Sequence, residues 1–217
     1  MVAQAPVEMA HPELTPHSGE PLAPHGDYDA VFFTDLDLSG QSASNARLLD
    51  CALLRCRADG VLLRRARFVE TLVADLQAAT VDLTESVWRD SLVTGGRIGA
   101  AAASSAKLSR VRFRGLKLDF LNLRGATLQD VVFQDCLLGE VDVTDAGLTD
   151  VDFGGSRVDS LTVRNATLAR VDLSGATLQT LSGLDHLRGA IVSAAQLLDL
   201  APLLADHLGI VVRDDQP

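Results

Sequence analysis

The chain has 217 residues, with 29 acidic against 19 basic side chains and a net charge of −10, and its length is that of one domain. Hydrophobic residues make up 47% but aromatic residues only 4%, so the core must consist mainly of Leu, Val and Ala. The negative charge argues against direct nucleic-acid binding, which needs an excess of Lys and Arg, and the absence of a long apolar run argues against a membrane span.

The first segment, residues 1–30, is predicted to be a disordered acidic tail. It holds five of the seven prolines, three of the five histidines, five acidic residues and no Lys or Arg. Such a composition cannot bury enough apolar surface to order the chain. The spacing of His11, His17 and His25 fits no compact metal site, and the segment lacks the basic and apolar regions of a secretory signal.

The second segment, residues 31–185, carries a repeat of five residues. Thirty consecutive blocks run from residue 31 to residue 180 without an insertion or deletion. The third position of every block is apolar, the first is apolar or small except at Gln41, and neither position ever holds a charge. This alternation predicts a short extended strand followed by a turn in each block.

Four such blocks close one square coil of 20 residues, which predicts about seven and a half coils. Successive coils are expected to stack at the strand spacing of about 4.8 Å, and each coil is stabilised by its neighbours. Four central positions hold alanine, and we expect thin spots in the core of the first five coils there. These are Ala43, Ala58, Ala78 and Ala103.

The blocks resemble the pattern A-(D/N)-L-x-x of the pentapeptide-repeat proteins. The best matches are VDLTE (81–85), LNLRG (121–125), ATLQD (126–130), VDLSG (171–175) and ATLQT (176–180). The resemblance implies an all-β solenoid, a right-handed quadrilateral β-helix, with a short α-helical C-terminal cap. The chain looks like the uninterrupted kind, similar at a distance to the mycobacterial fluoroquinolone-resistance proteins, and lacks the projecting loops of the Qnr type.

An apolar strip is predicted on the outside of the first coils, because residues 20 apart lie in one column. Exposed apolar strips usually mark a contact, here with the N-terminal tail, a second copy or another protein. The candidate contact strip consists of Phe32, Leu49, Val69, Leu72, Leu92 and Val132.

Charge is distributed unevenly along the predicted rod. Residues 31–125 hold 14 basic and 10 acidic side chains, whereas residues 126–185 hold 3 and 10. The C-terminal half could therefore meet a basic partner or present negative charge along a line, as a duplex does. The candidate acidic partner surface consists of Asp130, Asp135, Glu140, Asp142, Asp145, Asp150, Asp152, Asp159 and Asp172.

The last segment, residues 186–217, is predicted to be a helical cap over the open end of the solenoid. Ser193 and Gln196 form a capping box ahead of a leucine-rich run. Pro202 is expected to divide this run into two short helices. Gly209 is a C-cap signal, and a short extended piece is expected after it at 210–212. Some relatives build a homodimer with this helix. The candidate cap or dimer interface consists of Leu197, Leu198, Leu200, Leu203, Leu204 and Leu208.

We expect no catalytic residues, metal or cofactor. The repeat holds no histidine, so it cannot contain a histidine-based triad. Cys51, Cys56 and Cys136 occupy inward first positions, where cysteine behaves as a small hydrophobe. The glycine-rich stretch 95–99 lies in repeat register and lacks the context of a phosphate loop.

These features predict a non-catalytic scaffold that binds a protein partner, rather than nucleic acid or membrane, in the cytoplasm. The odd number of cysteines fits reduced thiols there. The alternative follows from the resemblance, because acidic pentapeptide-repeat proteins of the resistance groups are regarded as DNA mimics that bind DNA gyrase. The chain would then modulate gyrase or another type II topoisomerase.

Overall fold

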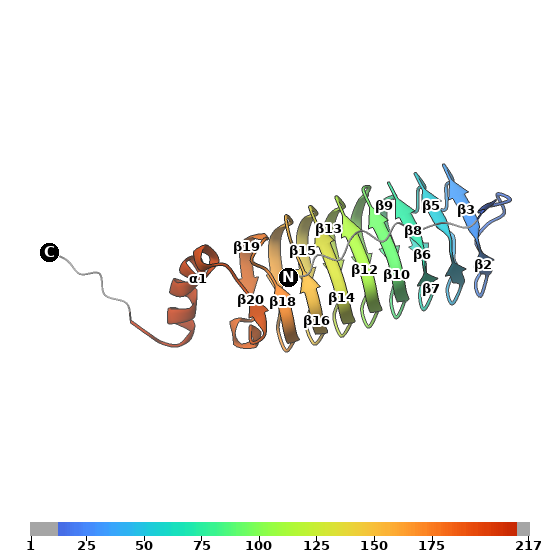
Figure 1. Ribbon diagram of the computed structural model, residues 1–217. Coiled ribbons are helices and arrows are strands. Elements are labelled where there is room, and N and C mark those ends of the chain that lie inside the picture. Colours follow the sequence, from blue (N-terminus) through green and yellow to red (C-terminus); the bar gives the residue numbers. More distant parts are fainter. Residues whose placement is uncertain (1–12, 212–217) are drawn as a thin grey trace.

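The computed structural model describes residues 13–211, which form a parallel β-solenoid with one C-terminal helix (Figure 1). The chain winds about nine times around one axis, and strands of successive coils pair in register at an offset of 20 residues. Leu92, for example, lies between Leu72 on one side and Arg112 on the other. The solenoid predicted from the five-residue period is confirmed.

The strands form two sheets that run the length of the rod. Sheet A contains β1 (Thr15–Pro16), β2 (Asp27–Asp29), β3 (Val31–Thr34), β4 (Arg47–Leu49), β5 (Ala52–Leu54), β7 (Arg67–Val69), β8 (Leu72–Ala74), β10 (Val87–Thr94), β12 (Lys107–Arg114), β14 (Thr127–Gln134), β16 (Gly147–Asp152), β18 (Thr167–Asp172) and β20 (Ala190–Ile191). Sheet B contains β6 (Val61–Leu62), β9 (Gln77–Asp82), β11 (Arg97–Ala102), β13 (Lys117–Asn122), β15 (Leu137–Asp142), β17 (Arg157–Thr162) and β19 (Thr177–Ser182).

Each corner of the coil is a tight turn at the end of a block. At one of them the Ser86 N–H donates to the Leu83 carbonyl at 3.0 Å, and Glu85 between them has a φ of 58°. A positive φ at this position is typical of type II turns and favours Gly, Asn and Asp over other residues. The fifth positions of the repeat meet this demand with many Asp, Asn and Gly residues.

The core is a stack of aliphatic side chains interrupted by short aromatic ladders. Phe113, Phe133 and Phe153 stack with ring centroids 4.8 and 4.9 Å apart, and Phe68 stacks on Trp88 at 3.9 Å. The spacings of the phenylalanine rings match the distance of about 4.8 Å between strands, so rings in one column pack face to face. The Trp88 indole N–H donates to the Ser86 hydroxyl at 3.1 Å, which satisfies its polar atom inside the core.

The disordered tail predicted for residues 1–30 is wrong from residue 13 onward, and residues 1–12 lie outside the described part. β1 pairs with β3, and β2 pairs with β4. Leu22 enters the core, and the His17 ring stacks on Phe33 at 4.5 Å. Tyr28 lies opposite Leu48 at the repeat offset of 20 residues, whereas Thr15 lies opposite Val31 at an offset of 16. The segment covers strand edges and core that an open solenoid end would expose.

The solenoid is also longer than predicted at its C-terminal end. A 3₁₀ helix, η1 (Leu184–His186), leads into β20, and β20 pairs with β18. Together with residues 13–30, this addition explains why the coils number about nine rather than seven and a half. The last coil has a different length, since Ile191 rather than residue 192 lies opposite Asp172.

The cap contains a single helix, α1 (Ala194–His207), so the expected division at Pro202 is wrong. Proline removes one N–H donor and destabilises a helix interior by about 3 kcal/mol. The hydrogen-bonded caps at both ends of this helix offset part of that cost. The capping box of Ser193 and Gln196 is present. At the other end Gly209 has a φ of 70°, and the N–H groups of Gly209 and Ile210 donate to Asp206 and Ala205, a Schellman motif. Residues 210 and 211 form no strand, and residue 212 lies outside the described part.

Candidate interaction surfaces

The apolar strip forms one continuous ladder on the outside of sheet A. Phe32, Ala52, Leu72 and Leu92 lie opposite one another in successive coils, and the same ladder continues through Arg112 to Val132. Leu49 and Val69 are paired in the adjacent ladder. The structure shows these large side chains as half-buried rather than fully exposed, and Ala52 as buried.

Basic side chains interrupt this ladder in the middle of the rod. On β12, Arg112 lies between Leu92 and Val132 of the neighbouring strands, and Arg114 lies between Thr94 and Gln134. Within residues 13–211 neither guanidinium forms an ion pair. The ladder then reaches Asp152 and Asp172. One flat face therefore passes from apolar to basic to acidic along the axis.

The nine candidate acidic residues are spread over all sides of the C-terminal half, and three of them are paired with arginine. Arg170 binds Asp150 through two bonds of 2.5 and 2.6 Å, Arg124 binds Asp142 at 3.1 Å, and Arg157 binds Asp159 at 2.8 Å. The hydrogen bonds from Arg170 lower the pKa of the Asp150 carboxyl. These pairs reduce the negative field that the sequence alone indicates.

Other acidic side chains have a local structural role. Asp152 accepts the Gly154 N–H at 2.7 Å and Asp172 accepts the Ser174 N–H at 2.8 Å, which fixes the turn after each strand. Both carboxylates still lack an arginine partner among the described residues. Asp130 in β14, Asp135 just after β14 and Glu140 in β15 likewise have no arginine partner among the described residues. Asp145 is also free of arginine and accepts from Asn165 at 3.1 Å. Asp130, Asp135, Asp152 and Asp172 lie on or beside sheet A, and we call them the acidic end of that sheet.

The helix α1 presents leucines to solvent. Leu198 and Leu208 are 75% and 69% exposed, and Leu197 and Leu203 are about half exposed. Leu200 and Leu204 are partly covered, and Leu200 packs against the core. Gln196 anchors the helix, because its side-chain amide donates to the carbonyls of Leu173 and Ala176 at 2.7 and 2.9 Å. The cap thus covers the solenoid end and leaves apolar surface uncovered.

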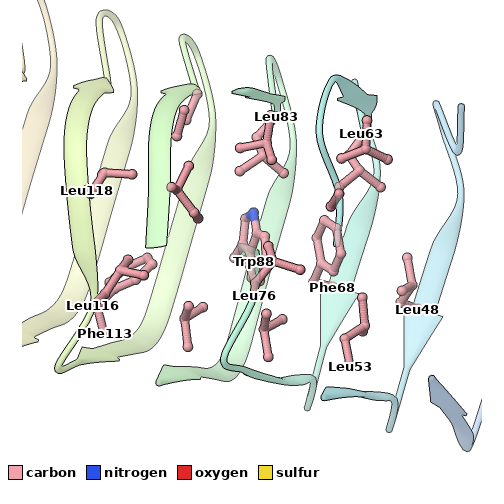
Figure 2. A pocket seen from close by; sticks show the side chains of 18 of the residues that line it. Leu48, Leu53, Leu63, Phe68, Leu76, Leu83, Trp88, Phe113, Leu116 and Leu118 are labelled. Atoms are coloured by element: carbon pink, nitrogen blue, oxygen red, sulfur yellow. The ribbon is translucent and has the colours of Figure 1, made fainter. Parts of the chain in front are cut away.

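An internal cavity of about 100 Å³ runs through the N-terminal half of the core (Figure 2). Only apolar side chains line it, among them Phe68, Trp88 and Leu116. Three of the four central alanines, Ala43, Ala58 and Ala103, also line it, so the predicted thin spots are present. The backbone sets the width of each coil, and an alanine side chain is too short to fill the space between opposite walls.

The cysteines and the glycine-rich stretch have structural surroundings. Cys51, Cys56 and Cys136 are buried free thiols, and burial raises the pKa of the Cys51 thiol to about 11. Gly95 and Gly96 form the corner between β10 and β11, with φ values of 63° and 82°. A Cβ on Gly99 would lie 2.5 Å from the Ala79 carbonyl oxygen, so this glycine permits close stacking of two coils.

Sequence reasoning missed an open polar pocket of about 500 Å³ between the last coils and the end of α1. It is assembled from three separate segments and is lined by Arg164, Asn165, Leu181, Ser182, Gly183, Leu184, Asp185, His186 and His207. The only signal in the sequence was that His186 and His207 are the two histidines beyond residue 25. Within residues 13–211 no group of three or more potential ligands is arranged to hold a metal ion.

Comparison with known proteins gives one family and several solved structures. Residues 99–163 match the family model described as pentapeptide repeat region. The full-length fluoroquinolone resistance protein QnrB1 is 15% identical, with a TM-score of 0.48 over 82% of this chain and 100% of that one. HetL, a protein involved in heterocyst differentiation regulation in the cyanobacterium Nostoc, is 16% identical, with a TM-score of 0.38 over 81% of this chain and 92% of that one. No curated protein sequence matches the chain.

Proposed function

We propose that the chain, whose residues 99–163 match the family model of the pentapeptide repeat region, acts as a non-catalytic scaffold that binds a protein partner. The observation that carries this proposal is the outer face of sheet A. There Leu92 lies between Leu72 and Arg112, and Arg112 has no carboxylate partner among the described residues. A flat surface with aliphatic and free guanidinium groups together fits a partner with apolar and acidic side chains.

The side chains that line the internal cavity of the described residues serve packing. The internal cavity is lined by apolar side chains alone, and these provide no acid, base or nucleophile. The thiol of Cys51 is buried, and its raised pKa keeps it protonated and poorly nucleophilic. Buried free thiols also support the proposal of a cytoplasmic location. No helix within residues 13–211 has the length and apolar character needed to cross a bilayer.

Partner capture with matched variants tests the scaffold proposal. Leu72→Lys and Leu92→Lys place charge in the strip, whereas Leu62→Lys introduces the same change in β6 of sheet B, where the leucine is 39% exposed. Proteins cross-linked to the wild type should be lost with both strip variants and retained with Leu62→Lys. Identical capture by all four proteins would show that the strip is not the contact.

A second candidate function is mimicry of DNA toward gyrase or another type II topoisomerase. It is favoured by the acidic end of sheet A, where Asp130, Asp135, Asp152 and Asp172 have no arginine partner among the described residues. Coils stack every 4.8 Å or so, which is of the same order as the phosphate spacing along a duplex strand. In this candidate the rod competes with DNA for a basic groove, and protection from fluoroquinolones follows from that competition.

A gyrase supercoiling assay separates the two candidates. The wild type should inhibit supercoiling or relieve fluoroquinolone inhibition, and the triple variant Asp130→Asn, Asp152→Asn, Asp172→Asn should lose the effect. Asp119→Asn is the control, because Asp119 already pairs with Arg97 at 2.8 Å. Absence of any effect of the wild type at micromolar concentration removes this candidate and leaves the scaffold proposal in place.

A further inference from the structure

The polar pocket at the C-terminal end is a site that the scaffold proposal does not use. One wall is the turn after β17, with Arg164 and Asn165, and the opposite wall is η1, with Asp185 and His186. His207 near the end of α1 forms the third side. The pocket therefore exists only where the solenoid and its cap come together.

The acidic group in the pocket is already engaged. The His207 Nε2 lies 2.5 Å from a carboxylate oxygen of Asp185, which ties α1 to η1. The Asn165 amide donates to Asp145 at 3.1 Å and is held at the rim. These two contacts fix the walls of the pocket and leave its other polar groups available.

Two groups in the pocket lack a partner among the described residues. The Arg164 guanidinium is exposed and forms no ion pair within residues 13–211. The His186 Nδ1 is buried and has no hydrogen-bond partner. A buried polar atom without a hydrogen-bond partner lowers the stability of the folded state. A bound ligand that supplies the missing partner would explain why this atom is retained.

We propose that this pocket binds a small oxyanion, a phosphate or carboxylate group, with Arg164 as its main anchor and His186 as a second donor. The planar guanidinium presents paired N–H groups that match the two oxygens of such a group. The His186 Nδ1 is buried, so it can donate to the ligand when it carries a proton and the ring turns to bring this atom to the pocket, which the Ser182 side chain also lines. Asp185 is the only carboxylate among the residues that line the pocket, and one of its oxygens lies against His207 Nε2.

Titration of the full chain with inorganic phosphate, and separately with acetate at constant ionic strength, tests the proposal. Long-range ¹H–¹⁵N spectra of the histidine rings should show a saturable change at His186, with a Kd in the millimolar range that is usual for such small ligands. Arg164→Gln should weaken binding at least about tenfold, since a charge-assisted pair is lost.

Arg124→Gln is the matched control. Arg124 occupies the same outward position two coils earlier, is already paired with Asp142 at 3.1 Å, and lies outside the pocket. This variant should bind as the wild type does. Saturation by phosphate alone identifies a phosphate site, and saturation by both anions identifies a general carboxylate and phosphate site. A linear, non-saturating response to both anions, or equal weakening in the two variants, would overturn the proposal. Because no partner protein is needed, this result is independent of the scaffold proposal.

Discussion

Alanine at a central position is the weakest point of the solenoid core at the scale of single residues. Ala58 is nearly fully buried, yet it borders the internal cavity, whereas Ala66 is fully buried and does not border it. The two positions differ because Ala58 is the third residue of its block and points to the axis, while Ala66 is a first residue beside a corner. Space for a larger side chain is therefore available at one alanine and absent at the other.

Filling the cavity should stabilise the protein. We expect Ala58→Val to raise the free energy of unfolding by about 1 kcal/mol, as cavity-filling changes commonly do. Ala66→Val should lower it by about 1–3 kcal/mol, because overpacking forces strain on the neighbours. Urea unfolding followed by the fluorescence of Trp88, the only tryptophan, measures both. Destabilisation by Ala58→Val of the same size as by Ala66→Val would mean that the cavity is not available for filling.

The buried thiol of Cys51 makes stability depend on alkaline pH. Burial raises its pKa to about 11 in the folded state, whereas an unfolded thiol has an ordinary pKa of about 8.5. The folded state thus holds the proton more tightly. The resulting stabilisation is present below the unfolded pKa and is lost as pH rises toward the folded one. Between about pH 8 and about pH 10.5, the wild type should lose more stability than Cys51→Ala in matched urea titrations. Parallel pH dependence of the two proteins would contradict this expectation.

The spacing of residues predicts the inward positions well, because the period repeats the same local geometry thirty times. It predicts single residues poorly where that geometry ends. Leu22 is buried and its N–H donates to the Gln41 side chain at 2.8 Å, yet no five-residue spacing marks it. The polar pocket escaped prediction for the same reason, since Arg164 and His207 meet only through the placement of the cap.

At the scale of elements, three contacts attach α1 to the solenoid: the Gln196 side chain, the packing of Leu200 on the core, and the contact of His207 with Asp185. Gln196 accepts from the Ser193 N–H at 2.8 Å and donates to two carbonyls of the last coils. It therefore caps the helix and joins it to the solenoid at once. The sequence predicts the capping box but not these two bonds, because they link residues about 20 apart around the coil.

Loss of the Gln196 side chain should release the helix locally. We expect Gln196→Ala to cost about 1–2 kcal/mol in the stability of α1, which corresponds to roughly tenfold faster amide hydrogen exchange in α1. Exchange in the central strands should stay unchanged. Gln179→Ala is the control, since Gln179 is exposed and has no side-chain bond in the described part. Equal protection of α1 in both variants would show that the contacts of Leu200 and His207 hold the helix without Gln196.

At the scale of the whole molecule, the charge of the rod is less one-sided than its sequence indicates. Arginines from neighbouring coils neutralise Asp142 and Asp150, and Asp159 pairs within its own strand. The sequence predicts which coils are acidic but not which carboxylates are free, because pairing depends on side chains meeting across coils. Of the unpaired carboxylates beside sheet A, Asp152 in β16 and Asp172 in β18 lie in the two strands that precede β20, the strand next to α1 (Figure 1). A homodimer formed through α1 would bring two such ends together.

Dimerisation through α1 stays a prediction, and two leucines test it best. Leu198 and Leu208 are the most exposed leucines of the described chain, and lysine at either position keeps good helix propensity. Removal of residues 186–217 is a poorer test, because it also deletes β20 and uncovers the last coil. Light scattering of the wild type should give twice the 23.0 kDa chain mass, and Leu198→Lys with Leu208→Lys should give the mass of one chain. Leu62→Lys, far from the cap, should leave the dimer intact. A wild type of 23.0 kDa at all concentrations would contradict the dimer and leave the leucines of α1 as a surface for another protein.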